Sequence, residues 1–487
     1  MDADVDVAVI GGGVLGCFAA RNLRRFNLRV QVVEREFELC GGITKANTGI
    51  VYSGYDTKPG SLKARLTLRA SRAFPQLCRE LSVPFRPTGS LMTAAGPRAT
   101  GVLQKKYATG LALGVPGLVL LAPPQIAALA PGLAPGVSAA LYSPGMGAVN
   151  PWELGLAAAD NAQANGAVFR TATAVSAMER RPEGYRLALS DNTILRARAV
   201  VNAAGLSAGQ VSELLMPPYF QIRPTRGDYI ILDPRAQAPG CIIQQEPEQK
   251  GKGATIVPTV DGNLLLGTSD EAVTRPGWTT TEASGLDFVA RSALAILPGL
   301  DLSLTIRTFA ALRPNPYWVK TVDGAVKLST RSIEDFLIDE PEDYPGFVNL
   351  AGIKTPGLTC ADEIGLYVAE RLAERLGAVP NRKFDPSREA GPRFGRLRPE
   401  EQMTSPPATI VCRCQKVTED EVRQAIRAPL PATTIDGVKR RAGCGMGRCQ
   451  GGYCTEHVLR LLAEEQGLPV GALCKEQEGS WVVCAKP

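Results

Sequence analysis

The chain has 487 residues, of which 45% are hydrophobic and 21% are charged, and its formal net charge is +6. This length exceeds what one compact core usually holds, so two or three domains are expected. The composition excludes an extensively disordered chain, and the small positive charge favours anionic ligands or an acidic partner rather than a nucleic acid.

Neither end of the chain nor its interior suggests a membrane-spanning helix. The start, Met1-Asp2-Ala3-Asp4, is acidic where a targeting segment would be basic, and twelve cysteines without a secretory signal favour a reducing cytoplasm. Residues 107–152 contain no charged side chain, which leaves a membrane or subunit-docking face as an alternative. Prolines interrupt this segment, whereas a spanning helix needs about 20 unbroken apolar residues. We expect a cytoplasmic protein without a transmembrane segment. Association with the membrane periphery through a partner is the alternative.

The N-terminal residues predict a dinucleotide site. Residues 4–10 form an apolar run typical of a buried strand, and a Gly-x-Gly-x-x-Gly motif follows at Gly11, Gly13 and Gly16. These glycines permit a tight turn, the approach of a pyrophosphate and close helix–strand packing, while the helix N-terminus offers N–H groups to phosphates. A second predicted strand ends at Glu34, where a carboxylate accepts hydrogen bonds from a ribose.

Two later segments favour FAD over NAD. Residues 200–205 form a predicted strand that ends in the small residues Ala204 and Gly205, which can lie against the dinucleotide. Residues 349–359 form a glycine-rich turn that opens a helix at about Cys360, and a helix N-terminus stabilises negative charge on a reduced flavin ring. Each segment alone is also compatible with an ordinary turn.

Together with residues 46–54, 58–64, 224–229, 263–267 and 309–314, these segments resemble the D-amino-acid-oxidase-like superfamily of FAD-dependent oxidoreductases. The likeness covers about residues 4–380 and is closest to the branch of glycerol-3-phosphate and L-2-hydroxyglutarate dehydrogenases. It implies an α/β fold over 1–380, in which a Rossmann-type FAD-binding domain is interleaved with a mixed-sheet substrate domain. The expected FAD-binding parts are about 1–85, 150–215 and 330–380, and the substrate-binding parts are about 86–149 and 216–329.

The resemblance also implies roles for particular residues. It places flavin contacts at Asn47, Thr48, Gly49, Gly357, Leu358 and Thr359. The arginine that matches Arg313 contacts the substrate's anionic group, through the bidentate fork that a guanidinium offers. The alternative for Arg313 is a structural ion pair.

Two positions depart from the pattern of this branch. Tyr52 stands where histidine is common, and it is either a hydrogen-bonding acid/base group or a packing residue. Its ordinary pKa near 10 makes it a poor base near neutrality. Lys354 stands where an acidic residue is frequent; it either binds an anionic substrate or stabilises the reduced ring, or it is a solvated surface lysine.

The C-terminal cysteines predict a metal cluster. Residues 381–408 are rich in proline, arginine and glycine, which indicates a linker lying on the catalytic domain. Beyond it, Cys412 and Cys414 form one close pair, and Cys449 and Cys454 form another. Paired thiolates from two separated loops are how a chain wraps a four-ligand cluster. A capping-box pattern follows the first pair and a helical pattern follows the second, so residues 409–487 are expected to form a compact helical domain with a tail.

Residues 445–454 resemble the bacterioferritin-associated-ferredoxin-like [2Fe-2S] domain, in the version fused to anaerobic glycerol-3-phosphate dehydrogenases and to opine- or amine-oxidising flavoproteins. By this match the ligands are Cys412, Cys414, Cys449 and Cys454. Cys444 is an extra cysteine in the same loop, and its use in place of Cys449 is the alternative. Zinc is the competing metal, because four thiolates also form a closed tetrahedral site, but zinc gives a flavin's electrons no exit.

The two halves together predict a dehydrogenase. A small anionic substrate is expected to bind over the flavin, hydride to pass to FAD, and electrons to leave singly through the [2Fe-2S] cluster. The first substrate expectation is sn-glycerol 3-phosphate or a close analogue, followed by L-2-hydroxyglutarate or another 2-hydroxy acid, and then a secondary amine or opine. The rival from another class is an electron-transfer subunit with a vestigial substrate site, which the loss of histidine at Tyr52 favours.

The expected partner is an electron-accepting flavoprotein or iron–sulfur subunit. The basic loop Lys439-Arg440-Arg441, beside the cluster, is a candidate for docking an acidic partner, and a solvated loop is the alternative.

Overall fold

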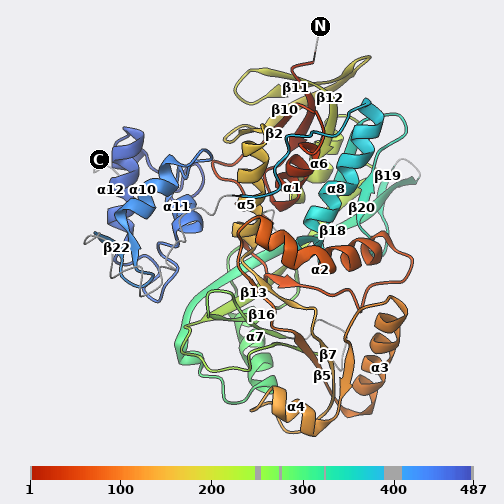
Figure 1. The fold of residues 1–487 in the computed structure, drawn as a ribbon, viewed down its shortest axis with the longest axis vertical. Coiled ribbons are helices and arrows are strands. Elements are labelled where there is room, and N and C mark those ends of the chain that lie inside the picture. Colours follow the sequence, from red (N-terminus) through yellow and green to blue (C-terminus); the bar gives the residue numbers. More distant parts are fainter. Residues whose placement is uncertain (1–2, 247–253, 274–276, 323–324, 389–408, 484–487) are drawn as a thin grey trace.

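The computed structural model describes residues 3–246, 254–273, 277–322, 325–388 and 409–483. These residues form a large α/β body and a small, mainly helical domain at one side of it (Figure 1). The predicted fold class is therefore confirmed. The exact domain boundaries given above stay predictions.

The first half of the body is a sheet in the order β10 (Val175–Arg181), β11 (Gly184–Leu189), β12 (Ile194–Asn202), β1 (Val5–Ile10), β2 (Val30–Val33) and β9 (Val168–Arg170). β1 pairs in parallel with β12 and β2, while β21 (Phe347–Ala351) pairs in parallel with β12 and antiparallel with β20 (Leu337–Asp339). Every residue of β1 is buried, as expected of a parallel strand covered on both faces. The carboxyl ends of the central parallel strands meet at one edge of the sheet, where dinucleotides bind in such folds.

Helices cover this sheet. α1 (Val14–Leu23) packs against α5 (Pro151–Ala164) and α8 (Gly357–Leu376), and α8 also contacts α2 (Leu62–Glu80). The close crossing of α1 and α8 depends on Gly365, where an added Cβ would lie 2.6 Å from the carbonyl oxygen of Phe18. The short α6 (Ala208–Glu213) follows β12.

The second half of the body is a mixed sheet. Its order is β19 (Ala325–Leu328), β18 (Thr305–Val322), β13 (Phe220–Leu232), β16 (Leu264–Gly267), β15 (Thr255–Pro258), β14 (Ile242–Gln245), β5 (Ser90–Ala95), β7 (Val137–Ser143) and β6 (Val119–Leu121), with β17 (Glu271–Ala272) beside β13. β3 (Ile50–Val51), β8 (Gly147–Val149) and β4 (Phe85–Arg86) form a smaller sheet. α3 (Gly96–Ala112), α4 (Pro123–Leu129) and α7 (Ala283–Ile296) pack on the mixed sheet.

The charge-free segment 107–152 belongs to this second half, where it supplies the end of α3 together with β6, α4, β7 and β8. Within the described ranges, no helix combines the length and the apolar character needed to cross a lipid bilayer. Leu111, Val119 and Leu129 are exposed on its surface.

The small domain contains β22 (Ile410–Cys412), β23 (Val417–Thr418), α10 (Glu419–Arg427), α11 (Ile435–Ala442) and α12 (Thr455–Gln466). The predicted capping box is present: the hydroxyl of Thr418 accepts from the backbone N–H of Glu421, and the Glu421 carboxylate accepts from that of Thr418. Val422, Val438 and Leu462 are fully buried in its apolar core.

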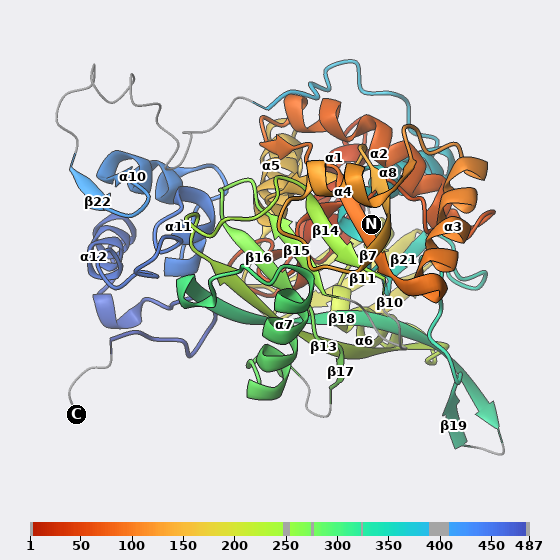
Figure 2. The ribbon, with the colours of Figure 1, turned by 90° about the horizontal axis from the view of Figure 1, so that it is seen from below.

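Charged contacts hold the small domain against the body. One oxygen of the buried Glu38 carboxylate accepts hydrogen bonds from the backbone N–H groups of Thr433 and Thr434, at 2.7 and 2.9 Å, and from both of their hydroxyls. Arg441 is 3.6 Å from Asp160, and Glu476 pairs with both Arg440 and Lys45. α11 accordingly lies on the side of the small domain nearest the body, whereas α12 lies on its outer side (Figures 1 and 2).

These contacts correct the prediction for Lys439-Arg440-Arg441. The three residues form the last turn of α11 rather than a loop, and the arginines are buried against carboxylates of this same chain. They are neither solvated nor free to dock a partner. Of the predicted linker, residues 381–388 lie on the body, with Arg388 paired to Asp160 at 2.8 Å, and residues 389–408 lie outside the described residues.

Candidate active site and metal centre

One continuous cavity of about 2460 Å³ runs from the end of β1, between the two halves of the body, to the small domain. Its walls include predicted site residues from every part of the sequence, namely Gly11, Gly13, Glu34, Asn47, Thr48, Gly49, Tyr52, Ala204, Gly205, Arg313, Lys354, Gly357 and Leu358. Gly16 and Thr359 do not line it.

The glycine motif forms the start of the cavity. Gly11 has φ +107°, and a Cβ there would lie 2.6 Å from the carbonyl oxygen of Ala203, so only glycine fits. A Cβ at Gly16 would lie 1.9 Å from the carbonyl oxygen of Gly11, which explains its packing role behind the wall. α1 begins at Val14 with no side-chain cap at Gly13, although the N–H of Val14 itself donates to the hydroxyl of Thr44 at 3.0 Å. Such a helix N-terminus offers its other first-turn N–H groups to phosphates.

Glu34 lies at the end of β2, where the ribose-binding acid was predicted. Its carboxylate accepts from the backbone N–H groups of Gly12 at 2.5 Å and Glu36 at 2.9 Å. Burial raises the pKa of Glu34, and these two hydrogen bonds oppose that rise. The fit of this end of the cavity to a dinucleotide therefore rests on both the backbone shape and an oriented carboxylate.

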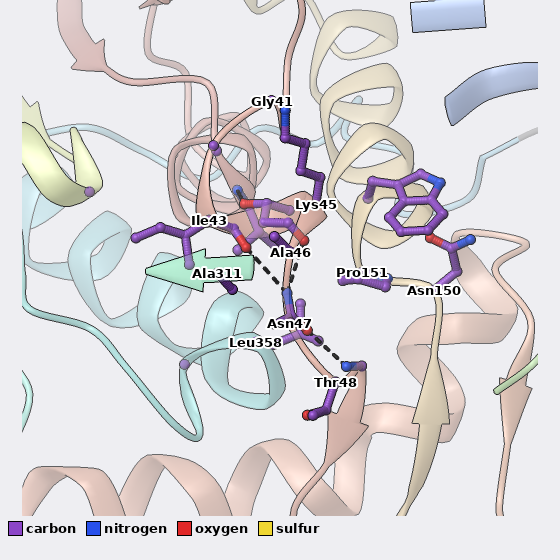
Figure 3. A pocket seen from close by; sticks show the side chains of 18 of the residues that line it. Gly41, Ile43, Lys45, Ala46, Asn47, Thr48, Asn150, Pro151, Ala311 and Leu358 are labelled. Carbon is purple, nitrogen blue, oxygen red and sulfur yellow. Dashed lines mark hydrogen bonds between the residues drawn. The ribbon is translucent and has the colours of Figure 1, made fainter. Parts of the chain in front are cut away.

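The segment from residue 43 to 49 forms the wall in the middle of the cavity (Figure 3). The Asn47 side chain stabilises its turn, donating to the carbonyl oxygen of Thr44 at 2.9 Å and accepting from the N–H of Gly49 at 2.8 Å. Thr48 and Leu358 line the same cavity, so the early turn and the start of α8 face the same space. The hydroxyl of the buried Thr359 accepts from the backbone N–H of Tyr52 at 3.0 Å and thereby joins the two walls.

Arg313 lies on β18 and reaches the cavity with a side chain that is 13% exposed. Its guanidinium donates to Asp270 at 2.6 Å and to the hydroxyl of Thr268 at 2.8 Å. The two alternatives for Arg313 are thus not exclusive, because it forms an ion pair and lines the cavity at the same time.

Lys354 is half-buried in the same cavity and is not a solvated surface lysine. Its ammonium group lies 3.0 Å from the side-chain oxygen of Asn315 and 3.4 Å from the hydroxyl of Ser332. Burial lowers the pKa of Lys354, and the neighbouring charge of Lys63 lowers it further. An anion bound beside it would favour the charged form.

Tyr52 is a half-buried part of the wall, and burial raises its pKa well above the ordinary value. The phenol therefore keeps its proton at neutral pH, and it can donate a hydrogen bond but cannot serve as a base. The sole histidine of the chain, His457, lies on α12 in the small domain.

Five cysteines of the small domain gather in two groups. The sulfur atoms of Cys412, Cys444 and Cys454 all lie within 4.8 Å of one another and are buried. Cys414 and Cys449 are exposed, and their sulfur atoms are 3.5 Å apart. A [2Fe-2S] cluster takes two thiolates on each iron, so one pair plus two of the buried three supply a complete set. This donor set fits the cluster.

Sequence reasoning missed the contact that joins the cavity to the cysteines. The guanidinium of Arg307, on β18, donates to the side-chain oxygen of Gln450 at 2.9 Å, and Gln450 follows Cys449 directly. Both residues line the cavity. No local pattern marks either residue, because they lie 143 positions apart.

Comparisons with known proteins agree with this geometry. Residues 6–371 match the family described as FAD dependent oxidoreductase, and residues 410–464 match the BFD-like [2Fe-2S] binding domain. A glycerol 3-phosphate dehydrogenase of Caloramator mitchellensis is 36% identical over 485 residues, covering 98% of each chain. The mitochondrial L-2-hydroxyglutarate dehydrogenase of Mus musculus is 31% identical over 76% of this chain and 83% of its own length.

Among solved structures, the dithionite-reduced L-alpha-glycerophosphate oxidase from Mycoplasma pneumoniae with FAD bound superposes with a TM-score of 0.72 at 24% identity. The match covers 80% of this chain and 99% of the oxidase. At that identity it supports the fold alone. The family matches and the full-length relative carry the conclusion: the chain belongs to the FAD-dependent oxidoreductase family, and its cofactors are FAD and a [2Fe-2S] cluster.

Proposed function

We propose that the protein is a dehydrogenase that oxidises sn-glycerol 3-phosphate and passes the electrons through its [2Fe-2S] cluster to a partner. The observation that carries this proposal is the position of Arg313 and Lys354, which line the same cavity as Thr48 and Gly357. The full-length relative named glycerol 3-phosphate dehydrogenase supports the choice of substrate.

Charge favours a phosphate monoester at this end of the cavity. Such a group carries a charge of about −1.5 to −2 at neutral pH. Asp270 neutralises part of the Arg313 charge, and Lys354 has no carboxylate among its described hydrogen-bond partners. A dianion would thus meet the fork of the Arg313 guanidinium and the amino group of Lys354, whose charged form the anion would favour.

The chain's own groups would orient the reaction. Bound FAD supplies hydride acceptance, and the bound cluster supplies one-electron transfer. α8 begins at Gly357, whose own N–H donates to the carbonyl oxygen of Lys354. The helix dipole and the later N–H groups of the first turn would stabilise negative charge in the cavity. Tyr52 would donate a hydrogen bond to a substrate oxygen, because its proton is retained.

L-2-hydroxyglutarate is the second candidate, supported by the 31% identical relative and by the same cationic pair, which also suits a dicarboxylate. A secondary amine or an opine ranks third. A vestigial substrate site, as in a pure electron-transfer subunit, fits less well with two cations directed at the cavity.

Anaerobic mixing of the cofactor-loaded protein with each substrate tests the proposal. sn-Glycerol 3-phosphate is expected to bleach the flavin absorbance and to produce a [2Fe-2S] electron paramagnetic resonance signal. Bleaching by L-2-hydroxyglutarate alone would move the assignment to the second candidate. If dithionite produces the cluster signal but neither compound bleaches the flavin, the substrate assignment is wrong.

A further inference from the structure

The candidate cluster site has one buried side and one exposed side. Cys412, Cys444 and Cys454 are buried, whereas Cys414 and Cys449 are exposed. Gln450, next to Cys449, contacts Arg307 of the body, and the loop then continues into α12 on the outer side of the small domain (Figures 1 and 2). Arg448, on the other side of Cys449, pairs with Asp233 of the body at 3.5 Å. The exposed thiols therefore lie beside the body, where electrons that reach the cluster from the cavity would find a solvent-accessible edge.

Cationic and aromatic side chains surround this edge. Arg413 and Lys416 are exposed on the loop that carries Cys414, and Tyr453 is 41% exposed on the loop that carries Cys449. The guanidinium carbon of Arg413 lies 4.2 Å from the centre of the Tyr453 ring. In the part of the chain that the structure describes, neither Arg413 nor Lys416 has a carboxylate partner, so both charges are free to act on a neighbour.

The small domain exposes a large share of the described apolar side chains. Fourteen large hydrophobic residues are exposed in the described chain, and seven of them fall between residues 410 and 483. A groove of about 810 Å³ begins at the 450–452 loop and is lined further along by Leu459, Val470, Val482 and Val483. Val482 and Val483 are 45% and 42% exposed. Exposed apolar side chains around a functional edge are typical of a protein contact.

We propose that this surface, formed by Arg413, Cys414, Lys416, Cys449, Tyr453, Val482 and Val483 and called the exit face below, docks an acidic protein that carries one electron. The proposal deepens the proposed function, because it assigns the surface through which electrons leave. Each docking event transfers one electron, so the cluster is oxidised and the carrier is reduced. Two events follow each two-electron substrate oxidation, and no bond is formed or broken at the exit face.

Charge complementarity selects the acidic partner. Two unpaired cations at the rim steer an acidic surface toward the exposed cysteines and raise the association rate, while the apolar groove supplies a small contact area. Weak electron-transfer complexes typically bury little surface, which agrees with a short groove rather than an extensive interface. The arginines of α11, which the sequence suggested for this task, are already buried against Asp160 and Glu476.

The test uses one haem protein in two charge states. Native cytochrome c is basic, and cytochrome c whose lysines are succinylated is acidic, while both accept one electron. The cofactor-loaded enzyme is reduced with dithionite, freed of the excess, and mixed anaerobically with each ferric form. The acidic form is expected to reoxidise the cluster about tenfold faster at low ionic strength, and this advantage should shrink as salt screens the charges.

Substitutions on the exit face test whether the difference between the two reoxidation rates arises there. Lys416→Glu and the double variant Arg413→Glu/Lys416→Glu should slow reoxidation by the acidic form and speed it by the native form. Val482→Ser/Val483→Ser should weaken the reaction with both forms while leaving the salt dependence unchanged. Arg181→Glu, an exposed position on β10 in the body, is the matched control and should change neither rate.

Two further measurements, the cluster signal of each variant and the affinity for each probe, separate loss of the cluster from loss of docking. Arg413 lies between two candidate ligands, so an intact cluster signal is required of each variant, and Lys416→Glu alone carries the test if the double variant loses iron. Binding of the ferric probes to the oxidised enzyme is measured separately as a dissociation constant. If Lys416→Glu and Arg181→Glu give equal reoxidation rates with both probes, the proposal that the exit face docks the carrier is wrong. Because dithionite replaces the substrate, a wrong substrate assignment would leave this result unaffected.

Discussion

Arg307 and Gln450 connect the strand of the substrate site to the loop of the metal centre. The guanidinium of Arg307 donates to the side-chain oxygen of Gln450 at 2.9 Å. Arg307 lies on β18, the strand that also carries Arg313, while Gln450 is adjacent to Cys449. A single strand, β18, thus spans from the part of the cavity that Arg313 lines to the contact with the cysteine loop.

Replacing Arg307 with Gln should loosen this connection. A hydrogen bond from a charged group contributes about 1.5–3 kcal/mol, so its loss should let the loop move relative to the cavity. We expect bleaching of the flavin by substrate to keep its rate while the cluster signal rises several-fold more slowly, as followed by stopped-flow absorbance and freeze-quench resonance. Arg291→Gln is the control, because Arg291 lies on α7 and pairs only with Asp287 among the described acids. An unchanged rate of cluster reduction, with full FAD content, would contradict the connecting role.

The lowered pKa of Lys354 predicts a pH-dependent affinity for the substrate. Burial favours the neutral amine, so the ammonium charge is present below the lowered pKa and is lost as the pH rises through it, earlier than for an ordinary lysine. The KM for sn-glycerol 3-phosphate should therefore increase above neutral pH. Lys354→Arg keeps its charge at every accessible pH and should remove this increase, whereas Lys354→Met should raise KM about 10- to 100-fold at pH 7. A KM that rises equally in the wild type and in Lys354→Arg would exclude Lys354 as the titrating group.

Tyr52→Phe separates a hydrogen-bond donor from a base. Because burial raises the pKa of Tyr52, the phenol should stay protonated throughout the range in which the enzyme works. Removing its hydroxyl should cost about 1 kcal/mol, or less than tenfold in kcat/KM, without moving either limb of the pH–rate profile. The disappearance of an acidic or alkaline limb in the variant would show that Tyr52 does titrate during turnover.

Local sequence patterns were sufficient for much of this architecture. Gly16 is required by a backbone contact with Gly11 five residues away, and the Thr418–Glu421 box is a feature of one helical turn, so each could be recognised from spacing alone. Contacts across the domain boundary could not be recognised from the sequence, because partners such as Glu38 and Thr434 lie 396 positions apart. The basic run at 439–441 was assigned wrongly for the same reason: its carboxylate partner Asp160 is distant in sequence, and nothing local distinguishes a buried basic turn from a solvated one.

The Glu38 contact predicts how the small domain is held. Glu38→Ala would leave the Thr433 and Thr434 donors without their shared acceptor, which should destabilise the docked domain by roughly 2–4 kcal/mol. Gly437→Ala should act similarly, because an added Cβ would lie 2.1 Å from a Glu38 carboxylate oxygen. In urea, loss of the cluster absorbance should shift to lower concentration while release of the flavin shifts less. Gly240→Ala is the control, since an added Cβ there meets nothing within 4 Å. Equal shifts of the urea midpoint in all three variants would show that the Glu38 contact does not hold the small domain in place.

The five cysteines between residues 412 and 454 allow a sharper test of the ligand set. The exposed pair, Cys414 and Cys449, would occupy one iron, and the other iron would take two of the three buried sulfurs. We propose Cys412 and Cys454 for that iron, which leaves Cys444 as an unused buried thiol. Cys444→Ala should therefore retain two irons per chain and an unchanged resonance signal, whereas Cys449→Ala and Cys454→Ala should each lose the cluster. If Cys444→Ala loses iron while Cys449→Ala retains it, Cys444 replaces Cys449 as a ligand, and the accessible edge of the cluster would then rest on Cys414 alone.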